Sequence, residues 1–323
     1  MFTAHGVHDR ALAAVATPPS SSLLLEAFAA NLRLARRHYA FVSMSEAVAM
    51  LAGTAPWREH CVALTFDDSL RCHARLTAPL LNRLGIPATF YVSTATVESQ
   101  QPYWWLRLEW ATKRLRPESI QLEEIDGQRF RLFPGMSTAE LRAVKSALKR
   151  VPAARCEAAV ERMEAAAAPT ASEAEAFHQF AAPLTWDEVR TLIRLGMTVG
   201  SHTCTHPHLA ALPPEAQARE LAVSKGTIEE QCGIACVHFS YPYGAYSLDT
   251  AAAARAAGYH SAVTTGQPGW NRPGSDLYQL MRFALPREPG KLAYLLCGWE
   301  GRMQSWRHGL ARSRREGTPE SWL

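Results

Sequence analysis

Residues 61–93 read CVALTFDDSLRCHARLTAPLLNRLGIPATFYVS, which has the pattern of a strand, a helix and a second strand. The apolar run at 61–66 is typical of a strand buried on both faces. Residues 70–85 then carry apolar side chains at helical spacing and end at Gly85, a common helix stop. The aromatic and β-branched residues at 86–93 favour another strand. The segment therefore predicts one βαβ unit.

The same alternation returns downstream. Residues 185–201 predict a helix that opens with a capping box, followed by a strand, and residues 213–264 predict two further helix–strand pairs. Strands that alternate with helices of this length indicate a parallel sheet or barrel whose active residues lie at the carboxyl ends of the strands. Asp67, His202 and Tyr243 stand at such ends.

The alternation breaks between about residues 102 and 183. This stretch contains several amphipathic helical patterns and one hairpin pattern, IDGQRFRLF. We predict a single α/β barrel domain over residues 1–323, with a mostly helical insertion at about 102–183 lying over one rim. We also predict a basic tail at about 302–323, and we favour a solvated tail over one that contacts an anionic membrane surface or an acidic glycan.

Composition excludes several classes of protein. The chain has 323 residues, of which 47% are hydrophobic and 20% charged, as in a folded globular protein. The formal charge of +4 comes without a basic stripe interleaved with aromatic residues, so nucleic acid is not an expected partner. No run of some twenty apolar residues occurs, so no transmembrane span is predicted, whereas peripheral membrane contact stays open.

The cysteines and the first thirty residues favour the cytoplasm. Seven cysteines form an odd set without a CxxC pair, which is typical of reduced thiols. The amino-terminal segment lacks the ordered basic, apolar and cleavage regions of an export signal. A truncated start would have removed such a signal, so the prediction applies to the sequence as it begins at Met1.

Two weak patterns reinforce each other as a candidate metal site. His202 and His206 are four residues apart after a predicted strand, so a helical or tight-loop geometry would present both imidazoles to one side. Alone, such a pair is more often solvated, and the Asp67–Asp68 pair after another strand is more often a turn or a helix cap. Together they supply two imidazoles and a carboxylate, with a second carboxylate free to take a proton from the metal's water.

Three segments resemble the motifs of the polysaccharide deacetylase family, also called carbohydrate esterase family 4: TFDDS at 65–69, GSHTCTHPHL at 200–209 and FSYPYGAYS at 239–247. The resemblance covers about 60–100 and 180–290 and leaves the insertion outside. It implies a distorted (β/α) barrel of about seven strands. It also implies a metal-dependent hydrolase of carbon–nitrogen bonds that removes the N-acetyl group of an amino sugar in a polysaccharide, oligosaccharide or lipid-linked glycan.

The resemblance implies a role for each matching residue. Asp67 would be the general base, and Asp68, His202 and His206 would bind a divalent metal, for which zinc is favoured while cobalt, nickel or manganese also fit. The backbone N–H of Tyr243 would help to hold the oxyanion.

Pro242 and Tyr241 belong to the same motif as Tyr243 and are candidates for substrate contact. Trp105 in the insertion could stack on a sugar ring, although aromatic residues at helical spacing are more often packing residues.

Two departures from the family pattern concern the base and the acid. Ser240 stands where the family usually has an arginine that orients the base, and Arg282 is the candidate replacement, with a surface salt bridge as an equal alternative. The late Leu-x-His motif that supplies the acid is not recognisable. His5 resembles a histidine that ends the first strand of related deacetylases, so it could face the site, or it could be a solvated terminal residue.

Two alternative functions stay open on the sequence. One is hydrolysis of another amide, such as a formamide on a sugar or a cyclic imide. The other is a glycan-binding protein of weak or no activity, which the missing arginine and acid histidine would allow.

Overall fold

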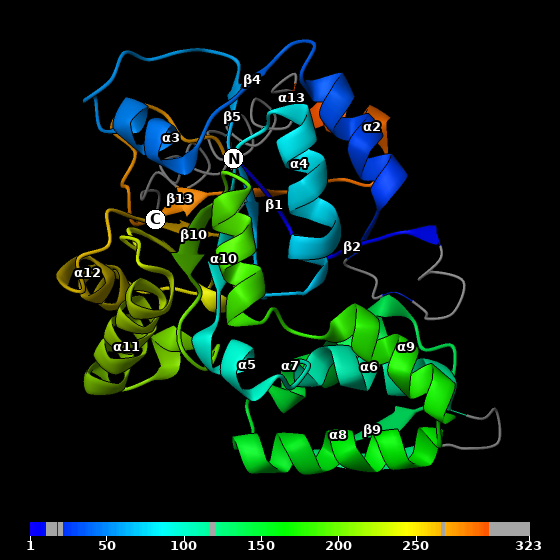
Figure 1. Ribbon diagram of the computed structural model, residues 1–323. Helices are drawn as coiled ribbons and strands as arrows, with labels where there is room; N and C mark the ends of the chain where they lie inside the picture. Colours follow the sequence, from blue (N-terminus) through cyan, green and yellow to red (C-terminus); the bar gives the residue numbers. More distant parts are fainter. Residues whose placement is uncertain (11–17, 19–21, 116–120, 266–268, 297–323) are drawn as a thin grey trace, which may run out of the picture.

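The computed structural model describes the chain in five parts, which are residues 1–10, 18, 22–115, 121–265 and 269–296 (Figure 1). The predicted basic tail at 302–323 lies outside these described residues. None of the helices that are described is both long and apolar enough to cross a membrane.

A parallel sheet of eight strands forms the centre of the fold, in the order β13-β12-β11-β10-β7-β6-β1-β14. The strands are β1 (Phe2–Ala4), β6 (Leu64–Phe66), β7 (Ala88–Val92), β10 (Thr198–Ser201), β11 (His238–Ser240), β12 (Ser261–Thr264), β13 (Leu280–Met281) and β14 (Phe283–Ala284). Most of their residues are buried, as expected for strands covered on both faces.

The two edges of this sheet are joined by one short segment. β13 pairs with β12 and β14 pairs with β1, and Arg282 alone separates β13 from β14. The segment 280–284 therefore bridges both edges and nearly closes a distorted barrel. The resemblance implied about seven strands, and the structure has eight because this segment contributes two short strands.

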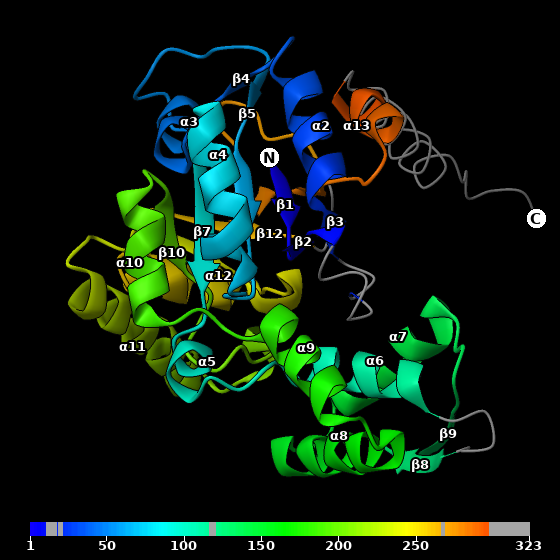
Figure 2. The same ribbon diagram turned by 45° about the vertical axis from the view of Figure 1, so that its right-hand side comes forward.

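Helices and short peripheral strands surround the barrel (Figures 1 and 2). The helices are α2 (Leu25–Ala35), α3 (Met44–Leu51), α4 (Ala78–Leu84), α5 (Thr94–Ser99), α10 (Trp186–Arg194), α11 (Pro214–Cys232), α12 (Leu248–Ala256) and α13 (Pro289–Leu296). Single turns are the π-helix η1 (His73–Thr77) and the 3₁₀ helices η2 (Leu209–Ala211) and η3 (Pro242–Gly244). The peripheral strands are β2 (Val7–His8) paired with β3 (Leu23–Leu24), and β4 (Ala40–Phe41) paired with β5 (Cys61–Val62).

The two helix ends predicted from the sequence are confirmed by the structure. The capping box predicted at the start of α10 is present, with the Thr185 hydroxyl and the Glu188 carboxylate bonding each other's backbone N–H groups. Gly85 ends α4 with a φ of +63°. The prediction of a single strand over residues 61–66 is wrong. The chain forms two strands, β5 and β6, which are separated at Ala63 and belong to different sheets.

The stretch that breaks the alternation forms a helical body with its own hydrophobic core. Its elements are α6 (Trp104–Arg114), β8 (Gln121–Ile125), β9 (Gln128–Leu132), α7 (Thr138–Leu148), α8 (Ala153–Ala167) and α9 (Ala171–Ala181). Arg107 on α6 bonds Glu157 and Glu164 on α8 and so ties two of its helices together. In Figures 1 and 2 this body lies beyond the carboxyl ends of the barrel strands.

Gly200 is tightly packed inside the barrel. A Cβ atom there would lie 2.7 Å from the His238 carbonyl oxygen and 2.7 Å from carbons of the Tyr91 ring. We expect Gly200→Ala to lower the free energy of unfolding by about 1–3 kcal/mol, because backbone and ring must shift. Gly226→Ala is the control, since it lies in α11 with open space around it and should gain up to about 1 kcal/mol. Urea unfolding of both variants measures these changes. An unchanged free energy of unfolding in Gly200→Ala would contradict the prediction.

Candidate active site

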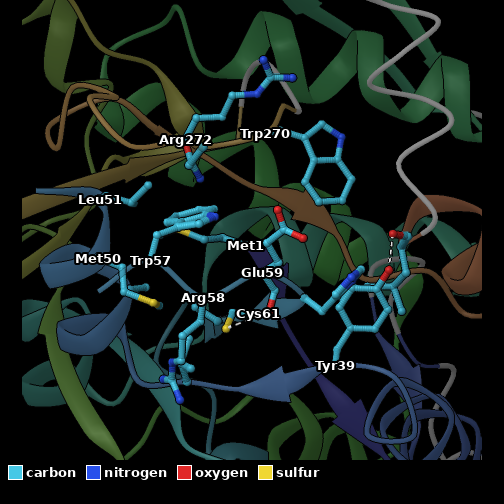
Figure 3. A pocket seen from close by; sticks show the side chains of 16 residues that line it. Met1, Tyr39, Met50, Leu51, Trp57, Arg58, Glu59, Cys61, Trp270 and Arg272 are labelled. Carbon is cyan, nitrogen blue, oxygen red and sulfur yellow. Dashed lines mark hydrogen bonds between the residues drawn. The ribbon is translucent and has the colours of Figure 1, made fainter. Parts of the chain in front are cut away.

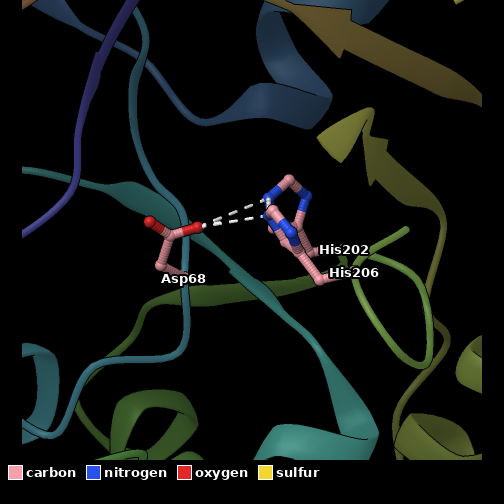
Figure 4. A group of neighbouring side chains, drawn as sticks. All are labelled: Asp68, His202 and His206. Carbon is pink, nitrogen blue, oxygen red and sulfur yellow. Dashed lines mark hydrogen bonds and ion pairs between the residues drawn. The ribbon is translucent and has the colours of Figure 1, made fainter. Parts of the chain in front are cut away.

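Three ligand-type side chains meet at the carboxyl ends of two barrel strands (Figure 4). Asp68 follows β6, and His202 and His206 follow β10. The Asp68 Oδ1 atom lies 3.7 Å from His202 Nε2 and 3.5 Å from His206 Nε2, and the two Nε2 atoms are 3.1 Å apart. In the described part of the chain, this is the one cluster of at least three such residues with metal-binding spacing.

These distances fit a divalent metal ion. Ligand atoms about 2.1 Å from a tetrahedrally coordinated ion lie about 3.4 Å apart, close to the three separations observed. His202 Nδ1–H donates to the Ser240 carbonyl oxygen at 2.7 Å, so the lone pair of its Nε2 atom faces the cluster. Two imidazole nitrogens and a carboxylate suit zinc, and cobalt, nickel and manganese also accept such ligands.

The segment from His202 to His206 is a tight loop and has no helical turn. Thr203 and His206 both have left-handed backbone angles, with φ of +66° and +57°. The Glu220 carboxylate, on α11, accepts hydrogen bonds from the backbone N–H groups of Cys204 at 2.8 Å and Thr205 at 2.9 Å. It also accepts from the Thr205 hydroxyl. Glu220 therefore holds the loop in an unusual conformation that presents both histidines to one point.

Glu220 was not predicted from the sequence, and it should matter for metal affinity. Glu220→Ala removes the acceptor for two loop N–H groups, so we expect metal affinity to fall about 10–100-fold. Glu230→Ala, at an exposed position of the same helix, is the matched control. Competition with a chromogenic chelator measures both variants. Equal affinities for the two would show that Glu220 does not position the ligands.

Asp67 is buried beside this cluster and is paired with Arg282. The guanidinium donates to both carboxylate oxygens of Asp67, at 2.9 and 2.7 Å. It also donates to the hydroxyls of Thr65 and Ser240, each at 2.9 Å. Arg282 thus reaches the neighbourhood of Ser240, where the family pattern has its arginine, and its side chain is fully buried.

The charge state of Asp67 follows from these contacts. Burial raises the pKa of this carboxyl, but the charge of Arg282 and the hydrogen bonds that it donates act in the opposite direction, and the pKa lies below its usual value. Asp67 is therefore an ionised carboxylate in a fixed orientation. The surface salt bridge considered as the alternative for Arg282 is wrong, because both partners are buried.

The other predicted residues lie at different depths around the cluster. His5 Nε2 is 4.0 Å from Asp68 Oδ2, and its side chain is 39% exposed, so it stands at the mouth. The Trp105 ring centroid lies 4.9 Å from that of His206, and the Tyr243 centroid lies 4.7 Å from it. Trp105 therefore packs against a ligand and also lines the cavity.

The YPYG segment forms the wall beside the ligands. Pro242 is buried in η3, and Tyr243 has a left-handed φ of +59°. The Tyr241 side chain is buried, and its hydroxyl donates to the Tyr278 carbonyl oxygen at 3.0 Å. That hydroxyl is thus directed at the barrel's own backbone.

Comparison with known proteins agrees with this geometry. The family model described as polysaccharide deacetylase matches residues 55–262, well over half of the chain. The chain belongs to the polysaccharide deacetylase family. A chitooligosaccharide deacetylase of Sinorhizobium fredii is 35% identical over 92 residues, which are 27% of this chain and 42% of that protein. The curated relatives are matched over about half of their own length or less.

Solved structures share the fold. The deacetylase PplD of Streptococcus pyogenes, in complex with acetate, superposes with a TM-score of 0.59 at 19% identity, covering 91% of this chain and 95% of PplD. IcaB from Ammonifex degensii gives 0.55 at 18% identity, covering 92% and 96%. At such identities the likeness shows the barrel fold alone.

The cavity over the candidate metal site of this polysaccharide deacetylase family member measures about 350 Å³. Barrel residues form its floor, and the insertion forms its outer wall. The insertion residues that line it are Trp105, Leu106, Glu109, Thr138, Leu141, Arg142, Lys145 and Lys149. The sequence predicted that the insertion covers one rim, but of these residues it singled out Trp105 alone.

A larger cavity of about 520 Å³ lies at the opposite end of the barrel (Figure 3). Met1 and Cys61, which precede the barrel strands β1 and β6, line it together with Trp57, Trp270 and Arg272. The metal-type cluster and the buried Asp67–Arg282 pair both lie at the other end. The smaller cavity is therefore the candidate active site.

Proposed function

We propose that this chain is a metal-dependent deacetylase that hydrolyses the N-acetyl group of an amino sugar in a polysaccharide, oligosaccharide or lipid-linked glycan. The observation that carries the proposal is the buried Asp67 carboxylate, paired with Arg282, directly beside three metal-type ligands. Membership of the polysaccharide deacetylase family supports the reaction class. The similarity to a chitooligosaccharide deacetylase supports an acetylated sugar as the substrate.

Asp68, His202 and His206 would hold the metal, which when bound polarises the acetamide carbonyl and lowers the pKa of a water molecule. Asp67 accepts the proton of the attacking water, and Arg282 keeps this carboxylate ionised and oriented. The backbone N–H of Tyr243, in its left-handed turn, donates a hydrogen bond to the developing oxyanion.

The group that protonates the departing amine is proposed to be His5. It lines the cavity, and its Nε2 atom is 4.0 Å from Asp68 Oδ2, on the solvent side of the cluster. A half-exposed imidazole there can donate a proton and regain one from water.

The inactive glycan-binding alternative depended on two missing groups. Arg282 takes the place of the missing arginine, because it contacts both Asp67 and Ser240. The proposed base, Asp67, therefore has an arginine partner. This contact favours the enzyme over the binding protein. Deformylation and imide hydrolysis use the same groups, so products must distinguish them.

The test combines metal analysis with product analysis. The purified chain is loaded with zinc, cobalt, nickel or manganese and offered N-acetylated and N-formylated sugars and a cyclic imide. We expect one metal per chain and release of acetate from an acetylated sugar, both lost on chelation and regained on reloading. Formate release alone would replace deacetylase by deformylase. Bound metal without product from any substrate would contradict the enzyme.

A further inference from the structure

The wall that the insertion adds to the active-site cavity is strongly cationic. Arg142, Lys145 and Lys149 all line the cavity. They follow one another on or just beyond α7 at spacings of three and four residues, so they share one face of that helix. The site therefore faces a row of positive side chains.

One carboxylate of the insertion lies within this wall, and it is already bonded. Glu109 is buried, and its two oxygens accept from Lys145 at 2.7 Å and from Lys113 at 3.0 Å. Three cations thus face the cavity against a single carboxylate from the insertion. On the barrel side, the charge of Asp67 is offset by Arg282, and Asp68 remains as one further carboxylate beside the two histidines.

Lys149 brings this positive charge close to the reacting groups. Its Nζ atom lies 3.9 Å from the centroid of the Tyr243 ring, and that ring lies 4.7 Å from the ring of His206. Desolvation and the neighbouring charge of Lys145 lower the pKa of Lys149, and the charge of Asp68 offsets this in part. A bound anion would relieve the repulsion between the two ammonium groups.

We propose that the substrate carries an anionic group, a phosphate or a carboxylate, which Lys149 and Arg142 bind while the acetamido group lies at the metal site. This inference rests on the proposed function and names its substrate class. A neutral glycan offers these cations only hydroxyl and carbonyl oxygens, whereas phosphate and carboxylate oxygens form stronger, charge-assisted hydrogen bonds with them.

The test compares two charged substrates with a neutral one. The probes are N-acetylglucosamine 1-phosphate, a disaccharide of glucuronic acid and N-acetylglucosamine, and neutral methyl N-acetylglucosaminide. We expect kcat/KM to be about tenfold higher or more for one charged probe than for the neutral one. The ratio of kcat/KM for the charged probe to kcat/KM for the neutral probe should fall toward 1 in the double variant Lys149→Met/Arg142→Gln. It should also fall at high salt. The better charged probe identifies phosphate or carboxylate.

Two controls separate this proposal from other outcomes. Arg150→Gln removes a nearby cation that bonds Asp126, outside the cavity lining, and should keep the ratio. Calorimetric binding of the charged probes to Asp67→Asn protein tests recognition without turnover. Acetate release with a ratio that the double variant leaves unchanged would overturn the anionic substrate. Anion binding lost in the double variant, with no acetate from any probe, would uphold recognition while the proposed function fails.

Discussion

Asp67→Asn is expected to reduce acetate release by about a thousandfold or more while the metal stays bound. The amide cannot accept a proton from water at neutral pH, and general-base catalysis typically contributes 10²–10⁴-fold. Asp68, His202 and His206 are unchanged in this variant, so the three ligands remain. The measurement is kcat with an acetylated sugar at saturating metal, together with the metal content per chain.

The neighbouring carboxylate provides the matched comparison. Asp68→Asn changes the adjacent residue in the same way, but it removes a ligand, so we expect loss of activity together with loss of metal. The two variants therefore separate the base from the ligand. An Asp67→Asn protein that retains near-normal kcat would show that this carboxylate is not the base.

Arg282→Met is expected to lower the free energy of unfolding by about 3–5 kcal/mol at neutral pH. It removes the bidentate partner of a buried carboxylate and leaves that charge uncompensated. In the parent chain the pKa of Asp67 is lowered on folding, so the pair contributes stability above the carboxyl's usual pKa and loses it as the pH falls. Without Arg282, burial raises the pKa of Asp67, so this carboxyl becomes protonated and neutral as the pH falls. The loss of stability caused by Arg282→Met should therefore be smaller in acid. Urea unfolding at two pH values measures both effects.

A double-mutant cycle shows whether Asp67 is the cause. In an Asp67→Asn background the buried negative charge is absent, so Arg282→Met should cost clearly less than in the parent chain. An equal cost in both backgrounds would assign the loss to packing around the arginine. Activity of Arg282→Met should also fall, because the base loses its fixed orientation.

Several expectations from the sequence stay predictions. The cytoplasmic location is one, and the solvated basic tail at 302–323, with peripheral membrane contact as its alternative, is another. The roles of Tyr243 and His5 are proposals that rest on position. The substrate contacts of Pro242, Tyr241 and Trp105 were candidates, and the structure directs the hydroxyl of Tyr241 to the backbone of the barrel.

The local sequence determined the parts of the fold that depend on neighbouring residues. Alternating apolar runs and helical spacing predicted strands and helices, and one capping box and one glycine predicted the ends of two helices. Because parallel strands present their carboxyl ends on one side, the segments after β6 and β10 could be expected to meet. Asp67, Asp68, His202 and His206 were identified in this way and through the family resemblance.

Tertiary structure alone decided which distant side chains complete the site. The family resemblance offered Arg282 as the partner of the base with a surface salt bridge as an equal alternative, and its pairing with Asp67, 215 residues apart, depends on how the segment 280–284 closes the barrel. The support of the histidine loop by Glu220 and the cationic wall of α7 depend on where a helix and an insertion pack. Periodicity and caps encode contacts within a few residues along the chain, whereas these contacts follow from packing between elements.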